Sequence, residues 1–392
     1  MKNLHSYKEH DRLCQAIGSA KAKVITYGMV ASNHFAFASD LLNSDNVSAN
    51  FDSDPAKWNA TLSLAGGGGA IPTLPLDRLE EEYKKADALV VMTGRLDEVG
   101  LYLDSKNLRY YFGEIIRDLP SNNILANIIA ERDKIADHQE EIARVKTLLS
   151  DRKSLEIYET LLKARASESL RERFSAARSV YESDQYFPKD IKAFYPSENE
   201  ILIDGGAYNG DTAQAFIKWT NGNFKHIYCF EPTAASFNEL RENLKAYPYT
   251  AYQKGLSDDN KALSFFVYDS SPTSTSTSQS SVPFVFGLEK VGAKRTVTID
   301  VCAIDKTIDD QATFIKMDIE GSELDALKGG AKTIQKYNPK LAICIYHKIE
   351  DFWEIPLYIH SLVPEYQFYI RHHTLTTKFY ETVLYAVCGK SD

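Results

Sequence analysis

Seven short segments rich in β-branched and aromatic residues follow Pro196, and they constrain the fold more than any other feature of the chain. The first five are separated by stretches of helical character, whereas the last two are joined by a short link. This spacing predicts a mostly parallel α/β sheet that ends in an antiparallel hairpin. The segments are "EILIDGG", "HIYCFEP", "YTAYQKGLS", "ATFIKMDIEG", "LAICIYH", "YQFYIRHH" and "ETVLYAV".

The first part of the chain shows a similar alternation between about residues 21 and 120. Strand-like "KVITYG", "VSANFD" and "DALVVMTG" alternate with helix-like "HFAFASDLL" and "LDRLEEEYKKA", which predicts a second parallel sheet. A dinucleotide site would need a GxGxxG turn after the first strand, but "YGMVASNHF" holds only Gly28. A structural or recognition role is therefore favoured over cofactor binding, and "AGGGGA" (65–70) is interpreted as a mobile loop.

Between these two parts, residues 121–185 are charged and almost free of glycine and proline. Ile128, Ile135, Ile142 and Leu149 recur at seven-residue spacing, but polar residues interrupt the second apolar row that a coiled coil requires. Amphipathic connector helices are therefore favoured over a dimerising coiled coil. A homodimer built by another part of the chain stays open.

The length predicts more than one domain, because 392 residues exceed the size at which a single hydrophobic core usually stops growing. We predict a Rossmann-like α/β domain at residues 1–120, a helical connector at 121–185 and a larger α/β domain at 186–392. A serine- and threonine-rich stretch at 270–281 is expected to interrupt the larger domain as a polar loop.

Composition and charge exclude several classes of protein. The net charge of −9 argues against broad nucleic-acid binding, which needs clustered lysine and arginine. The five cysteines are scattered and odd in number, which favours reduced thiols over a disulfide framework. The start of the chain lacks the apolar region of a signal peptide, and no apolar stretch is long enough to span a bilayer. A cytoplasmic protein is therefore expected.

The stretch "ILIDGGAYNGDT" (201–212) places a strand end, a glycine turn and a helix start where α/β sheets bind ligands. Gly206 and Gly210 allow close backbone approach, while Asp204 adds a negative charge beside the ligand. That carboxylate would repel a pyrophosphate and attract an ammonium group. Tyr208 also occupies the place of the middle glycine of GxGxxG. The turn therefore predicts a cationic ligand.

A second acidic residue follows some 27 positions later, where "IYCFEP" ends its strand at Glu231. A carboxylate there can accept hydrogen bonds from both hydroxyls of a ribose. A ligand with an ammonium group and a ribose indicates S-adenosylmethionine. The alternative is that Asp204 and Glu231 are two solvated carboxylates at strand ends.

These motifs carry a family resemblance. In order and spacing, "IDGGAYNGDT", "IYCFEP", "FIKMDIEGSELDALKGG", "PKLAICIYHK" and "ETVLYAV" resemble the FkbM family of S-adenosylmethionine-dependent methyltransferases, over about residues 186–392. The resemblance implies a class I methyltransferase sheet and methylation of a hydroxyl on a sugar, glycan or other secondary metabolite. The first segment resembles the degenerate Rossmann-like domains that precede some family members.

By the family's pattern, Asp204, Gly206 and Gly210 would line the methionine end of the cofactor and Glu231 the ribose. The predicted cofactor-binding residues are Asp204, Gly205, Gly206, Ala207, Tyr208, Asn209, Gly210 and Glu231.

Methyl transfer to a hydroxyl needs a base within hydrogen-bond reach of the acceptor, and a carboxylate or imidazole is suitable. "KMDIEG" offers Asp318 and Glu320 at a strand end, directed to one side of the extended backbone. His347 ends the next strand, and these three are the predicted catalytic residues. Asp318 is also the candidate ligand for a possible Mg²⁺, although no third ligand is evident. His372 and His373 are expected at the surface.

Two other functions stay open. A nicotinamide-dependent oxidoreductase would need a pyrophosphate-compatible turn, which Asp204 and Tyr208 disfavour. A binding or scaffold protein could keep a methyltransferase fold without activity. The acceptor itself, whether a small molecule or a glycan, depends on pocket shape and is not readable from the sequence.

Overall fold

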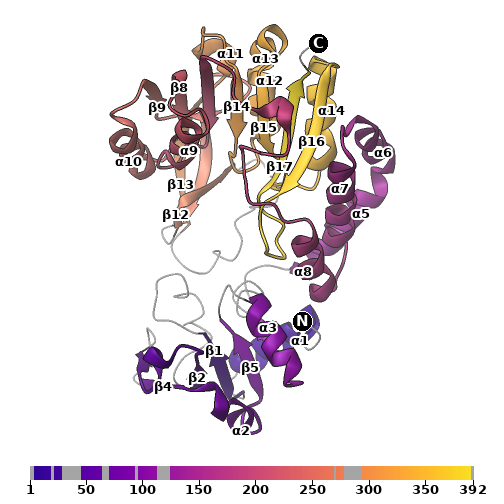
Figure 1. Cartoon of the computed structure of the whole chain (residues 1–392), viewed down its shortest axis with the longest axis vertical. Helices are drawn as coiled ribbons and strands as arrows, with labels where there is room; N and C mark the ends of the chain where they lie inside the picture. The colour runs from indigo at the N-terminus through magenta and orange to yellow at the C-terminus, as the bar shows by residue number, and fades with distance from the viewer. Residues whose placement is uncertain are drawn as a thin grey trace. The chain divides into compact units, whose positions relative to one another are not determined.

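The computed structural model describes residues 4–18, 22–28, 46–63, 70–92, 96–112, 124–268, 271–277 and 294–389 (Figure 1). The chain divides into two compact units. The first holds the described residues of Met1–Ile129 together with Ser167–Arg173. The second holds Ala130–Ala166 and the described residues from Phe174 onward.

The first unit contains the predicted second sheet, with six strands in the order β3-β4-β2-β1-β5-β6; all neighbours are parallel except β3, which runs antiparallel to β4. "KVITYG", "VSANFD" and "DALVVMTG" form β1, β2 and β5, as predicted, while β3, β4 and β6 were not foreseen because each is short or lacks alternation. The predicted helix at 34–42 and residues 65–69 of "AGGGGA" lie outside the described residues, while Ala70 begins β4. The elements are α1 Tyr7–Gly18, β1 Val24–Tyr27, β2 Val47–Phe51, η2 Pro55–Lys57, β3 Thr61–Ser63, β4 Ala70–Leu74, η3 Leu76–Arg78, α2 Leu79–Tyr83, β5 Ala88–Val91, α3 Leu96–Ser105 and β6 Tyr111–Phe112.

The second unit is built on a seven-stranded sheet in the order β16-β17-β15-β14-β7-β8-β9. The strands β15, β14, β7, β8 and β9 are parallel, and β17 runs antiparallel to both β15 and β16. The predicted parallel sheet with an antiparallel hairpin is thus confirmed. The strands are β7 Glu200–Gly205, β8 Phe224–Phe230, β9 Tyr249–Tyr252, β14 Phe314–Met317, β15 Lys340–Cys344, β16 Tyr366–His372 and β17 Thr382–Cys388.

Helices cover both faces of this sheet, and successive strand residues alternate between two apolar clusters. Ile203 and Leu341 pack with α7 and α14 on one face, whereas Leu202 and Ala342 pack with α9 and α10 on the other. The helices of this unit are α6 Gln139–Leu148, α7 Arg152–Arg165, η4 Lys192–Phe194, α9 Asp211–Trp219, α10 Ala234–Leu244, α11 Ile304–Thr307, α12 Glu323–Gly329, α13 Ala331–Tyr337 and α14 Asp351–Leu362.

The predicted connector segment is helical. It forms α6 and α7, together with α5 (Ile124–Asp137) and α8 (Leu170–Ser179). Ile142 is buried in the core of the second unit, and Ile135 and Leu149 pack against the same cluster. These three residues of the seven-residue row therefore pack against the core of their own chain. The three-part domain division itself stays a prediction.

A smaller sheet of the second unit was not foreseen. It has the order β10-β13-β11-β12, with β11 (Lys261–Tyr268) antiparallel to both β12 (Ser271–Thr277) and β13 (Lys294–Cys302), and it includes β10 (Gly255–Leu256). The loop predicted at 270–281 is thus wrong for Ser271–Thr277, because strand pairing uses backbone groups and β-branched threonine suits a pleated strand. Residues 278–281 lie outside the described part.

The cysteines and the helices bear on two further expectations from composition. All five cysteines are free thiols, four of them buried, as their scattered positions predicted. Within the described ranges, no helix combines the length and apolar character needed to cross a bilayer. A homodimer and a cytoplasmic location stay predictions.

Candidate active site

The order of the main sheet reverses at β7, which has β8 on one side and β14 on the other. Ligands of open α/β sheets bind outside the carboxyl ends of strands at such a point. A cavity of about 490 Å³ lies there, a size usual for small-molecule sites. It is lined by Gln185, Tyr186, Gly206, Tyr208, Asp211, Thr212, Phe230, Glu231, Pro232, Thr233, Gly255, Leu256, Lys316, Asp318, Ile319, Glu320, Ser322, Tyr346 and Glu381.

The predicted glycine turn forms one wall of this cavity, and Glu231 holds it in place. The Glu231 carboxylate accepts hydrogen bonds from the backbone N–H groups of Tyr208 (3.0 Å) and Thr233 (2.8 Å). Burial raises the pKa of Glu231, although these N–H groups oppose the shift. The side chain is 7% exposed and still lines the cavity. Glu231 therefore both fixes the turn and faces the cavity.

Gly206 is required by the close approach of two strand ends. Its φ is +72°, and an added Cβ would lie 1.9 Å from the carbonyl oxygen of Asp318. Gly222 also has a positive φ of +76°, but an added Cβ there would have no atom within 4 Å. These two glycines form a matched pair: both have a positive φ, but only at Gly206 would an added side chain overlap with another atom.

We therefore expect Gly206→Ala to destabilise the protein more than Gly222→Ala. Gly222→Ala should lower the free energy of unfolding by about 1–2 kcal/mol, the cost of a left-handed conformation for alanine. Gly206→Ala should lower it by this amount and, in addition, by the cost of moving β7 away from β14. Urea denaturation of both variants measures the difference. Equal losses would show that the turn does not depend on this contact.

Asp204 lies beneath the cavity and does not line it. Its side chain is 0% exposed, and the ammonium of Lys316 lies 3.1 Å from Oδ1. Burial raises the pKa of Asp204, while Lys316 opposes that shift. The sequence predicted a ligand as the source of the cation beside Asp204, but the structure pairs Asp204 with Lys316 because both side chains are buried together. The other turn residues outside the lining are Gly205, Ala207, Asn209 and Gly210.

Asp318 sits at the end of β14 and is held by two tyrosines. The hydroxyl of Tyr186 donates to Oδ2 (2.8 Å), and the hydroxyl of Tyr346 donates to Oδ1 (2.9 Å). Burial acts to raise the pKa of Asp318, but His347, Lys316 and these hydroxyls outweigh it and lower the pKa. Asp318 is therefore an ionised, fixed acceptor.

His347 lies three residues beyond the end of β15, 3% exposed and outside the cavity lining. Its Nδ1 lies 3.0 Å from Glu323, and its Nε2 lies 3.5 Å from Asp318 and 3.8 Å from Glu320. Burial would lower the pKa of His347, but the three carboxylates outweigh it and raise the pKa to about 10. His347 is thus an imidazolium at neutral pH, which suits charge compensation better than the base role predicted for it.

One ligand atom each from Asp318, Glu323 and His347 lies within 4.8 Å of the others, which supplies the third metal ligand that the sequence did not reveal. This set does not fit the Mg²⁺ considered there. Mg²⁺ prefers oxygen ligands in octahedral geometry, whereas one donor here is an imidazole. Both Asp318 oxygens also accept hydrogen bonds from tyrosines, and Glu323 already accepts from the N–H of Ile319 (2.8 Å).

Glu320 and Glu381 complete the acidic side of the cavity. Burial raises the pKa of Glu320 to about 7, with His347 opposing the shift. Burial also raises the pKa of Glu381, and the amide of Gln185 donates a hydrogen bond to it. Glu320 therefore changes its charge near neutral pH while facing the cavity.

Strained backbone is concentrated around this cavity. Tyr186, Tyr208, Glu320 and Glu381 all line it with positive φ values of 64°, 44°, 57° and 57°. Among the described residues, the other non-glycine positions with positive φ are five asparagines and Phe379. Such conformations cost about 1–3 kcal/mol each for ordinary residues and cluster at functional sites.

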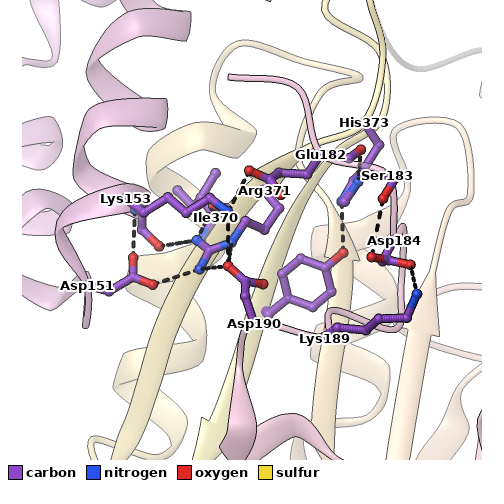
Figure 2. A network of polar contacts seen from close by, with 12 residues as sticks. Asp151, Lys153, Glu182, Ser183, Asp184, Lys189, Asp190, Ile370, Arg371 and His373 are labelled. Atoms are coloured by element: carbon purple, nitrogen blue, oxygen red, sulfur yellow. Dashed lines mark hydrogen bonds and ion pairs between the residues drawn. The ribbon is translucent and has the colours of Figure 1, made fainter. Parts of the chain in front are cut away.

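A polar network anchors the segment that carries Gln185 and Tyr186. The Arg371 side chain is 2% exposed and lies between Asp151 and Asp190, donating to them at 2.7 and 2.9 Å (Figure 2). It ties β16 to α7 and to the chain that follows Tyr186. Because Asp190 lies on the same segment as Gln185 and Tyr186, its bond to Arg371 holds that segment against the sheet. The network thereby fixes where Gln185 and Tyr186 reach the cavity.

His373 continues this network on the other side (Figure 2). Its Nδ1 lies 2.9 Å from the carbonyl oxygen of Glu182, and its Nε2 lies 2.9 Å from the hydroxyl of Tyr385. That hydroxyl accepts a hydrogen bond from the N–H of Tyr186 (3.0 Å). His372 is 0% exposed, so its expected surface location is wrong; its Nδ1 lies 2.8 Å from the hydroxyl of Thr382 on β17, and its ring packs near Phe379.

Several cavity residues were missed by sequence reasoning. Lys316 and Tyr346 precede predicted residues at the same strand ends, so strand-end position was the available signal. Gln185 and Tyr186 lie where the predicted connector meets the larger domain, and no local pattern marks them. Glu381 begins the last strand segment, and only its proximity to β15 through the sheet brings it to the cavity.

The second unit therefore has a class I methyltransferase fold, with a ligand cavity at the reversal of strand order. Residues 204–373 match the methyltransferase FkbM domain. The sequence resemblance to the FkbM family is thus confirmed.

Two relatives illustrate the likeness. The hexuronic acid methyltransferase AglP of Haloferax volcanii is 29% identical over 147 residues, which are 36% of this chain and 54% of that protein. The chain thus spans about half the length of this curated relative. The crystal structure of a methyltransferase FkbM from Methylobacillus flagellatus KT has a TM-score of 0.65 and 21% identity, covering 97% of this chain and 98% of that one. That likeness concerns the fold.

Proposed function

We propose that this protein is an S-adenosylmethionine-dependent O-methyltransferase that acts on a sugar hydroxyl. The observation that carries the proposal is a single cavity faced by the glycine turn, Glu231 and the acidic end of β14. One side offers ribose-binding chemistry and the other offers a base. The FkbM domain match supports methyl transfer, and the name of the Haloferax relative supports a sugar acceptor.

The cofactor side would use the glycine turn and Glu231. The Glu231 carboxylate can accept hydrogen bonds from two ribose hydroxyls, since each oxygen has a second acceptor site beside its backbone partner. Gly206 lines the cavity without a side chain, which would leave room for the methionine end. When bound, the cofactor supplies an electrophilic methyl group on a sulfonium, whose positive charge matches the acidic wall.

The acceptor side would use Glu320 as the base. A base is most effective when its pKa lies near the working pH, and Glu320 has a pKa of about 7. Asp318 would accept a hydrogen bond from the acceptor sugar and orient it, since the two tyrosines hold this carboxylate rigidly. The positive charge of His347 would offset the repulsion between the carboxylates of Asp318 and Glu320. Orientation of two reactants can lower a barrier by about 7–11 kcal/mol.

Titration calorimetry tests the cofactor assignment. S-adenosylhomocysteine is expected to bind with micromolar affinity, NAD is not, and Glu231→Ala should weaken S-adenosylhomocysteine at least tenfold, since two ribose hydrogen bonds are lost. The control Glu242→Ala changes an exposed carboxylate on α10 that pairs with Lys245, and it should leave affinity unchanged. Binding of NAD alone would favour the oxidoreductase, and binding of neither would favour the scaffold protein.

A further inference from the structure

The cavity is lined by an unusual excess of negative charge. Its ionisable side chains include five carboxylates and, among the described residues, one cation, Lys316. Three of the carboxylates, Asp318, Glu320 and Glu381, stand on the side assigned above to the acceptor. A substrate that enters this side therefore meets acceptors of hydrogen bonds and negative charge.

The ammonium of Lys316 is not available to an anionic substrate. It has three N–H donors. Three oxygens lie within reach: Oδ1 of Asp204 at 3.1 Å and the carbonyl oxygens of Gly205 and Gly206 at 3.2 and 2.9 Å. The side chain is only 2% exposed. A carboxylate on the substrate could gain its hydrogen bonds only if one of these were broken.

Three other side-chain donors near the cavity are directed at the protein's own carboxylates. Tyr186 and Tyr346 donate to Asp318, and Gln185 donates to Glu381. The imidazolium of His347 faces Glu323 and lies outside the lining. The wall thus presents oxygen acceptors, and neutral hydroxyl groups are the donors that complement them.

We propose that the acceptor is an uncharged sugar and that a hexuronate is rejected, with Glu381 as a determinant of this selectivity. The inference rests on the proposed function and concerns its substrate class. A hexuronate carboxylate beside three carboxylates would face like-charge repulsion, which strongly disfavours a wrong partner. This differs from the substrate class in the name of the Haloferax relative.

Paired acceptors test the proposal. Methyl glycosides of common hexoses and the corresponding methyl hexuronosides differ only by a hydroxymethyl group or a carboxylate, and S-adenosylhomocysteine release measures turnover. The neutral members should be favoured at least tenfold in kcat/KM. Equal or better turnover of a hexuronate would overturn the proposal, as would the absence of turnover with every neutral member. Calorimetric binding of S-adenosylhomocysteine, measured without acceptor, separates failure of this inference from failure of the proposed function.

A variant tests the role of Glu381. Glu381→Gln keeps the shape and removes the charge, so the ratio of neutral to hexuronate kcat/KM should fall several-fold. A residue that only supports the fold would lower both rates and leave the ratio unchanged. The control Glu365→Gln alters an exposed carboxylate before β16 and should not change the ratio. An unchanged ratio in Glu381→Gln would exclude Glu381 as a determinant.

Discussion

Replacing Glu320 by glutamine is expected to lower kcat by about 10²- to 10⁴-fold, the usual contribution of a general base. Glutamine has nearly the same shape but cannot accept the proton of the acceptor hydroxyl. The cofactor side of the cavity is formed by other residues, so the affinity for S-adenosylhomocysteine should stay within about twofold. Single-turnover methyl transfer and calorimetry on the same preparation separate the two effects.

The pH profile gives an independent readout of this residue. Only the deprotonated form of Glu320 can act as a base, and its pKa is about 7. The wild-type rate should therefore rise through pH 7 to a plateau, reaching about a tenth of the plateau at pH 6. Glu320→Gln should lose this inflection, while Glu354→Gln, an exposed change on α14, should keep it. A variant that retains the wild-type profile would remove Glu320 from the chemistry.

Replacing Lys316 by methionine is expected to cause the largest loss of stability, about 3–5 kcal/mol in the free energy of unfolding. The change leaves the Asp204 carboxylate fully buried without its cation. The double variant Asp204→Asn with Lys316→Met removes both charges and should be at least about 2 kcal/mol more stable than the single variant. Urea denaturation measures both, and equal stability of the two would contradict the account.

The same pair predicts a dependence on pH. Burial already raises the pKa of Asp204, and loss of Lys316 removes the main opposing influence. The folded single variant should then hold a proton that the unfolded chain releases, so its stability should fall as pH rises from 5 to 8. The double variant has no carboxylate at this position and should not share that fall.

The fold was largely predictable because strands and helices leave local signals. The seven segments after Pro196 became the strands of the main sheet, apart from "YTAYQKGLS", which splits into β9 and β10. The short strands β3 and β6 and the serine-rich β12 left no usable pattern, since pairing through the backbone can stabilise almost any sequence. Prediction therefore failed where tertiary contacts overrode local preference.

The candidate site was predictable in position and less so in composition. The strand ends indicated Glu231, Asp318 and Glu320, and all three line the cavity. Asp204 was predicted to attract a ligand ammonium, but it is buried beside Lys316. His347 was predicted to act as a base, but it is buried beside Glu323. Charge at a strand end is visible in the sequence, whereas its partner and degree of burial are not.

By itself the sequence determined the alternation of strands and helices, the glycine turn and the acidic residues that follow it, because these depend on neighbours along the chain. The tertiary structure alone decided which charges meet. It paired Lys316 with Asp204, placed two tyrosines on Asp318 and brought Glu381 to the cavity. Such contacts join residues far apart in the chain, and burial then sets their protonation, so no local pattern can record them.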